Sequence, residues 1–95
     1  MATYSDLVVN VASGNAIIVV TTTIYTVPVG RRAEVTFMAQ STGTVTYNIQ
    51  GVTASLATTP TKFETLRLDA GDSIQLIVAA GNASYAFTAF EYTNP

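Results

Sequence analysis

Alternating apolar and polar residues dominate this chain, and no helical period persists for more than one turn. The clearest alternation covers residues 33–40, and a second one covers residues 45–50 after the turn-forming segment Ser41-Thr42-Gly43-Thr44. Two such runs around a connection that contains glycine predict a β-hairpin with one buried face. The residues expected on that buried face are Ala33, Val35, Phe37, Ala39, Val45, Tyr47 and Ile49.

The run Ile17–Val27 is longer than a usual strand of about 5–6 residues. It is therefore either two strands or one strand that bends between sheets near Thr21–Thr23. Residues 54–57 form either a short edge strand or a helical turn. Phe63 is out of phase with Leu66 and Leu68, which predicts a β-bulge or a position at the rim. The other predicted strands are Leu7–Ala12, Lys62–Asp69, Ser73–Ala79 and Ser84–Tyr92, and the first of them is expected to end at Ser13-Gly14-Asn15.

About seven or eight short strands at near-regular spacing predict an all-β fold, a single antiparallel β-sandwich over residues 1–95. Eight strands would make a jelly roll, and seven would make a plain Greek-key sandwich. Residues 1–5 are expected to form a flexible N-terminal arm. The last strand carries large side chains on both faces, so it is either a central strand covered on both sides or a strand whose outer face meets a neighbouring subunit.

The amino-acid composition narrows the range of possible functions. The chain has no cysteine and no histidine, which excludes disulfides, thiolate metal sites and catalytic triads. Charged residues make up 11% of the chain, against about 25% in an average soluble domain. A sheet surface with so little charge is poorly protected against edge-to-edge pairing, which favours a subunit whose edges are covered by partners. The low charge argues against nucleic-acid binding, since Arg31-Arg32 is the only adjacent basic pair. No apolar run is long enough to span a membrane, and the N-terminus lacks the pattern of a secretory signal.

Candidate chemistry is sparse, and we expect neither an enzyme nor a bound cofactor. Lys62 is the only lysine and lies beside a predicted loop, where a solvated side chain is expected. Asp69 and Asp72 flank a two-residue turn and are the candidates for a calcium site or a glycosidase pair. The turn interpretation is favoured, because aspartate accepts hydrogen bonds from nearby backbone amides. The remaining acidic residues, Asp6, Glu34, Glu64 and Glu91, have no evident partner in the sequence.

Several side chains are candidates for contacts with another subunit. Aromatic residues on the last strand suit the centre of an interface, and an arginine after a turn suits an intersubunit ion pair, although a solvated arginine is the favoured alternative. A tyrosine in the expected arm would anchor it on a neighbour. These candidates are Tyr4, Arg31, Arg32, Tyr85, Phe87, Phe90 and Tyr92.

Two turn segments carry a resemblance to a known group of proteins. The first is Tyr25-Thr26-Val27-Pro28-Val29-Gly30-Arg31, and the second is Leu66-Arg67-Leu68-Asp69-Ala70-Gly71-Asp72-Ser73-Ile74-Gln75-Leu76. Together they resemble the small β-sandwich structural proteins of tailed-bacteriophage virions. The resemblance covers roughly a quarter of the chain, and both segments are also ordinary turn chemistry.

The resemblance implies a capsid decoration (cement) protein, synthesised in the host cytoplasm and placed on the outside of the virion. Such a protein would bind the major capsid protein, or copies of itself as a homotrimer, and stabilise the shell. The alternative is a tail-fibre, spike or head-fibre component that recognises a receptor or glycan. Because the sequence begins at Met1 and ends on a full strand, we expect a whole gene product, which favours the decoration protein.

Overall fold

The structure is a computed structural model in which residues 8–93 are described, apart from the side chain of Glu64. Over this range the chain forms eight β-strands and no helix, so none of the described residues belongs to a helix able to cross a membrane. The strands are β1 (Val8–Ile18), β2 (Thr22–Thr26), β3 (Arg31–Ser41), β4 (Thr44–Ile49), β5 (Val52–Ser55), β6 (Thr61–Leu68), β7 (Ser73–Ala80) and β8 (Ala83–Thr93).

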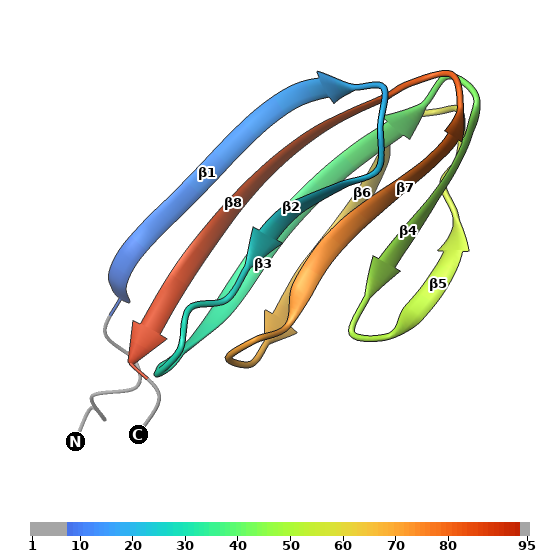
Figure 1. Cartoon of the computed structure of the whole chain (residues 1–95). Helices are drawn as coiled ribbons and strands as arrows, with labels where there is room; N and C mark the ends of the chain where they lie inside the picture. Colours follow the sequence, from blue (N-terminus) through green and yellow to red (C-terminus); the bar gives the residue numbers. More distant parts are fainter. Residues whose placement is uncertain (1–7, 94–95) are drawn as a thin grey trace.

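Two four-stranded antiparallel sheets lie face to face (Figure 1). The first sheet has the order β1-β8-β3-β6, and the second has the order β2-β7-β4-β5. Among the described strands, only the connection from β4 to β5 joins two strands of the same sheet. This order is that of a jelly roll. The predicted all-β sandwich is therefore confirmed, and of the two predicted topologies the chain adopts the jelly roll.

The predicted hairpin of residues 33–50 is wrong, because β3 and β4 lie in different sheets. β3 pairs with β6 and β8, whereas β4 pairs with β5 and β7. Thr42 and Gly43 carry the chain across the sandwich, and a Cβ atom at Gly43 would overlap the carbonyl oxygen of Ala80. Alternation shows that one face of a strand is buried, but it does not identify the neighbouring strand. The two apolar faces meet across the interior instead of side by side.

The first predicted strand is too short. β1 continues through Ser13-Gly14-Asn15, the segment predicted to be a turn, and it pairs with β8 along most of its length. Gly14 lies opposite Phe87, and a Cβ atom there would be 2.9 Å from the aromatic ring. The glycine therefore makes room for a ring and does not reverse the chain. Beyond Ile18 the chain leaves the first sheet and enters β2, which confirms the alternative of two strands within residues 17–27.

The interior is filled by apolar side chains from both sheets. Val35 and Phe37 of β3 face Ile74 and Leu76 of β7, and all four are fully buried. The predicted bulge at Phe63 is confirmed: the β3–β6 register shifts there, and the Phe63 ring lies 5.2 Å from that of Phe37. Of the two alternatives for residues 54–57, the short edge strand is correct in kind, but β5 lies earlier and ends at Ser55.

The last strand, β8, lies in the middle of the first sheet, between β1 and β3. Its inner face contributes Phe87 and Ala89 to the core. Its outer face carries Phe90, whose side chain is exposed. The alternative of a central strand covered on both faces is therefore wrong within this chain, because nothing in the described residues buries that outer ring.

Candidate interaction surface

Exposed aliphatic side chains gather along β1 and the segment that follows it. We call the set Val8, Val9, Val11, Ile17, Val19 and Val20 the β1 strip. Ile17 is 73% exposed, Val19 67% and Val20 64%. The β1 strip holds six of the ten large hydrophobic residues that are exposed in the described part of the chain. Large exposed apolar groups concentrated in one segment are typical of an interaction surface.

The backbone of β1 is open along the same stretch. β1 lies at the end of the first sheet and pairs only with β8 among the described strands, as Figure 1 shows along one long side of the sandwich. Its eleven residues include no charge and no proline, the usual devices that prevent an edge strand from pairing with another chain. An open row of amides and carbonyls therefore lies beside the β1 strip.

The outer face of the first sheet continues this surface across β8 and β3. Phe90 and Met38 are both exposed there. Two shallow hollows of ≈ 260 and ≈ 190 Å³ share Met38 and Ala86 in their linings. Both linings offer more apolar than polar surface, so this face adds to the hydrophobic area that begins at β1.

A buried carboxylate fastens the start of β1 to the rest of the sandwich. Glu91 of β8 is only 2% exposed. It accepts hydrogen bonds from the Tyr25 hydroxyl at 2.6 Å, from Arg31 Nη1 at 2.7 Å and from Asn10 Nδ2 at 3.2 Å. The donors come from β2, β3 and β1, so one side chain joins four strands and both sheets. The Arg31 contact is also an ion pair.

Titration of this cluster follows from its geometry. Burial acts to raise the pKa of Glu91, but the hydrogen bonds from Tyr25, Arg31 and Asn10 outweigh it, so its pKa lies below the ordinary 4.5. Burial, and then the hydrogen bond to the Glu91 carboxylate, raise the pKa of Tyr25 well above the ordinary 10.0. At neutral pH the cluster therefore holds a charged glutamate and a neutral tyrosine, the pair that its hydrogen bonds require.

The sequence analysis missed Glu91 as a functional or structural residue. The signal that could have found it is its phase, because Glu91 follows Phe87 and Ala89 at every second position and so faces the interior. A charge at an inward position indicates a buried partner. Its partner Arg31 is 60 residues away along the chain, and no spacing rule connects the two.

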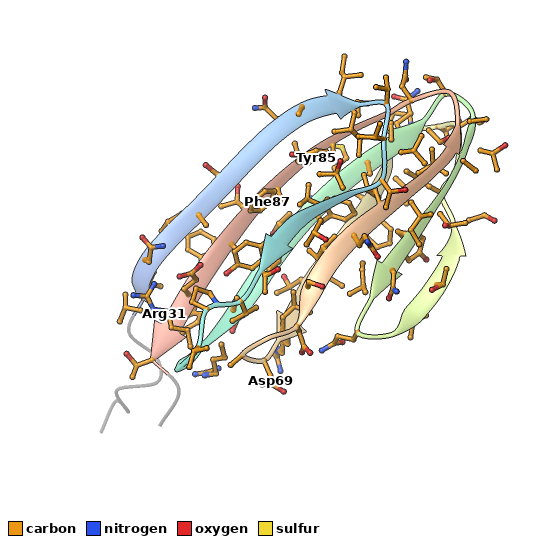
Figure 2. All side chains as sticks on the ribbon, viewed as in Figure 1. Arg31, Asp69, Tyr85 and Phe87 are labelled. Atoms are coloured by element: carbon orange, nitrogen blue, oxygen red, sulfur yellow. The ribbon has the colours of Figure 1, made fainter. Side chains whose placement is uncertain are left out.

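The Asp72 carboxylate is hydrogen-bonded within the Asp69–Asp72 turn and to Gln50. Asp72 Oδ2 accepts hydrogen bonds from the Asp69 amide at 2.9 Å and from Gln50 Nε2 at 3.0 Å. These contacts, the Gln50 bond first, hold the pKa of Asp72 below its usual value. The side chain of Asp69 projects at the end of the sandwich (Figure 2). Among the described residues, no three acidic, cysteine or histidine side chains come together as a metal site would need.

The candidate interface residues fall into separate places. Tyr85 and Phe87 point into the sandwich, where their rings lie 6.4 Å apart and Phe87 also meets Tyr25 (Figure 2). Phe90 and Tyr92 lie on the outer face of β8, and Arg32 lies over the Tyr92 ring at 5.0 Å. Arg31 is taken up by Glu91 of its own chain. Tyr4 and the arm of residues 1–5 lie outside the described residues.

Comparison with solved structures shows a similar fold in a protein of known structure. No protein-family model matches this chain, and no curated protein matches it. Among solved structures, the chain is similar to one described as Bacillus endospore appendages that form a family of disulfide-linked pili. The identity is 16%, the match covers 90% of this chain and 89% of that chain, and the TM-score is 0.54. At this identity the likeness shows a shared fold.

These findings overturn the expected identity. The prediction of a tailed-phage virion protein, placed on the capsid as a decoration subunit, is wrong, because the matching structure belongs to a bacterial endospore appendage and no virion family matches. The fibre or spike alternative has no support either. The major capsid protein is accordingly withdrawn as a partner.

The structure explains why the two turn segments misled the sequence analysis. Each segment links a strand of one sheet to a strand of the other, and the two turns lie side by side. The Val27 amide donates to the Asp72 carbonyl at 2.9 Å, and the Gly71 amide donates to the Val27 carbonyl at 3.0 Å. Gly30 and Gly71 adopt positive φ angles of 79° and 87°, which favour glycine. The shared pattern describes a corner that this fold needs, whatever the protein does.

Proposed function

We propose that this chain is a structural subunit that assembles with copies of itself into a surface appendage and catalyses no reaction. The observation that carries the proposal is the β1 strip beside an unguarded edge strand. An exposed hydrophobic segment of this kind is a liability for a monomer, and burial against another copy removes it. The shared fold with a pilus protein supports the same class of function.

Assembly of this chain would differ in one respect from that of the disulfide-linked pili. The chain contains no cysteine, so disulfides cannot link its copies. Backbone pairing at strand edges and burial of aliphatic side chains supply noncovalent contacts. We therefore expect assembly to depend on protein concentration and to be indifferent to reducing agents.

The test is the size of the purified chain as a function of concentration, measured by light scattering and electron microscopy. The variant Ile17→Lys places a charge in the β1 strip, and the matched control Val52→Lys places one on a valine of β5 that is 64% exposed, against 73% for Ile17. We expect the unmodified chain and Val52→Lys to form oligomers or filaments, and Ile17→Lys to remain small. A chain that stays monomeric at all concentrations would contradict the proposal.

A further inference from the structure

The sequence of residues 8–20, which include β1 and the two residues after it, is nearly symmetric about Gly14. Read outward from that glycine, each residue on one side has a counterpart of the same chemical kind on the other. The exception is Asn10 with Ile18, and Asn10 is the residue that donates to Glu91. The symmetric pairs are Ser13 with Asn15, Ala12 with Ala16, Val11 with Ile17, Val9 with Val19, and Val8 with Val20.

Such symmetry has a direct structural meaning for an edge strand. When two identical strands pair antiparallel about a two-fold axis, every residue faces its mirror position in the partner, and the same surface is used by both copies. A segment that is symmetric in chemistry then sets aliphatic against aliphatic and polar against polar. We propose that β1 pairs antiparallel with β1 of a second copy about an axis at Gly14, an inference that rests on the proposed function.

The side-chain faces fit this arrangement. Val11 and Ile17 lie on the outer face, opposite Phe90 and Ser84 of β8. Across the axis, Val11 of each copy would pack against Ile17 of the other, giving two aliphatic contacts on the same outer face as Phe90. Because paired positions share a face of the sheet, the polar side chains of Ser13 and Asn15 also meet each other. No charge occurs between residues 7 and 30, so no like charges are opposed.

The inner face is equally compatible. Ala12 and Ala16 would meet beside the axis, and their small side chains leave room for two strands to approach. Gly14 itself has the Phe87 ring packed against it, so the position on the axis is supported from within each subunit. The result is a continuous eight-stranded sheet with the order β6-β3-β8-β1-β1-β8-β3-β6. Because this contact closes on itself, a longer polymer would use a second surface of the dimer.

The competing partner for β1 is β6, the other edge of the same sheet, which would continue the sheet in one direction. Lys62 and Arg67 are exposed on β6, and the bulge at Phe63 interrupts its register. Charges and bulges of this kind oppose pairing with another strand. The edge of β1 has neither over residues 10–18, which favours β1 of a second copy.

Disulfide cross-linking tests both the partner and the axis, because the chain has no cysteine of its own. Two single variants, Ser13→Cys and Asn15→Cys, are purified separately and oxidised alone and as an equal mixture. Directly opposed residues lie about 4.5–5.5 Å apart and can form a disulfide, whereas diagonal ones lie about 7–8 Å apart. We expect about ten times more covalent dimer from the mixture than from either variant alone.

A second pair of variants, Val11→Cys and Ile17→Cys, guards against a cysteine that disturbs folding, and each variant is checked by circular dichroism. If Ser13→Cys alone forms as much covalent dimer as the equal mixture does, the axis at Gly14 is wrong. Absence of covalent dimer from both mixtures, while light scattering still reports assembly of the unmodified chain, would overturn β1 pairing and leave the proposed function standing. A chain that light scattering finds monomeric would instead refute the proposed function.

Discussion

The two edges of the first sheet, β1 and β6, expose the same backbone groups but differ in their side chains. β6 carries Lys62 and Arg67 on its surface and a bulge at Phe63. β1 is longer, has no charged residue, and bears the β1 strip; its own register shift lies at its start, between Val8 and Asn10, and leaves residues 10–18 regular. Protection against edge pairing is therefore present on one edge of this sheet and absent from the other. One edge is guarded in the way of a soluble monomer, and the other is left in the state expected of a contact between subunits.

The second sheet supports this interpretation by a different route. Its edges are β2 and β5, which have five and four residues. None of its four strands contains a charged residue. Short edge strands are themselves a protection, since they offer few groups for another chain to pair with. Among the described strands, β1 is thus the long edge without a guard.

The largest expected effect comes from guarding β1 in the manner of β6. The double variant Val11→Lys, Ile17→Lys removes two aliphatic contacts per chain and sets lysines opposite one another. Burial of one such side chain contributes about 1.5–3 kcal/mol, so at least ~3 kcal/mol of association is lost. The dissociation constant should rise by a factor of about 100 or more. Sedimentation or light scattering measures it, and an unchanged constant would show that β1 is not the contact.

The next effect is on the free energy of unfolding, and it concerns the side-chain hydrogen bonds that attach each edge strand to the rest of the sandwich. Asn10 attaches β1 to the buried Glu91 cluster, whereas β6 accepts a hydrogen bond at its Arg67 carbonyl from the exposed Gln50 side chain. Glu91→Ala leaves the buried Tyr25 hydroxyl without its partner and releases Arg31, which is 38% exposed and can be solvated. The free energy of unfolding should fall by about 2–4 kcal/mol. Chemical denaturation measures this loss, and Asp69→Asn, at an exposed carboxylate of the turn after β6, is the control.

A smaller effect is the dependence of stability on pH. The pKa of Glu91 is lowered in the folded chain, so its contribution is complete above the ordinary value of 4.5 and is lost as pH falls through the folded value. Tyr25 has a raised pKa, so stability is also lost as pH rises above 10.0. Thermal melting across pH should show both declines. Glu91→Gln should flatten the acid one, and an unchanged acid limb would assign it to other carboxylates.

The smallest effect is expected from removing the guard of β6. The double variant Lys62→Thr, Arg67→Thr removes both basic residues from this edge but leaves Glu64, its bulge and its shorter length. Exposed charges contribute little to folding, so the free energy of unfolding should change by less than about 1 kcal/mol. We expect at most weak new association by light scattering. Association as strong as that through β1 would show that charge alone distinguishes the two edges.

Much of the fold could be predicted from local chemistry. The alternation of Val35 and Phe37 with polar residues identified β3, and the phase of Phe63 predicted either a bulge or a rim position, of which the structure has the bulge. Ser13-Gly14-Asn15 was misread as a turn because glycine has two uses, and only the Phe87 ring opposite Gly14 decides between them. The residues of the β1 strip were divided between two predicted strand segments with no prediction of their exposure, because an aliphatic run has the same sequence whether it is covered or exposed.

A charge-poor β-sandwich without cysteine or histidine could be predicted from the amino-acid sequence, because strand period, turn residues and composition are local properties. The separation of β3 and β4 into different sheets and the contact of Glu91 with Arg31 became visible only in the folded chain. The same holds for the position of β1 at an open edge. Pairing between strands joins residues far apart along the chain, and it is set by how two apolar faces close on each other, which no local pattern records.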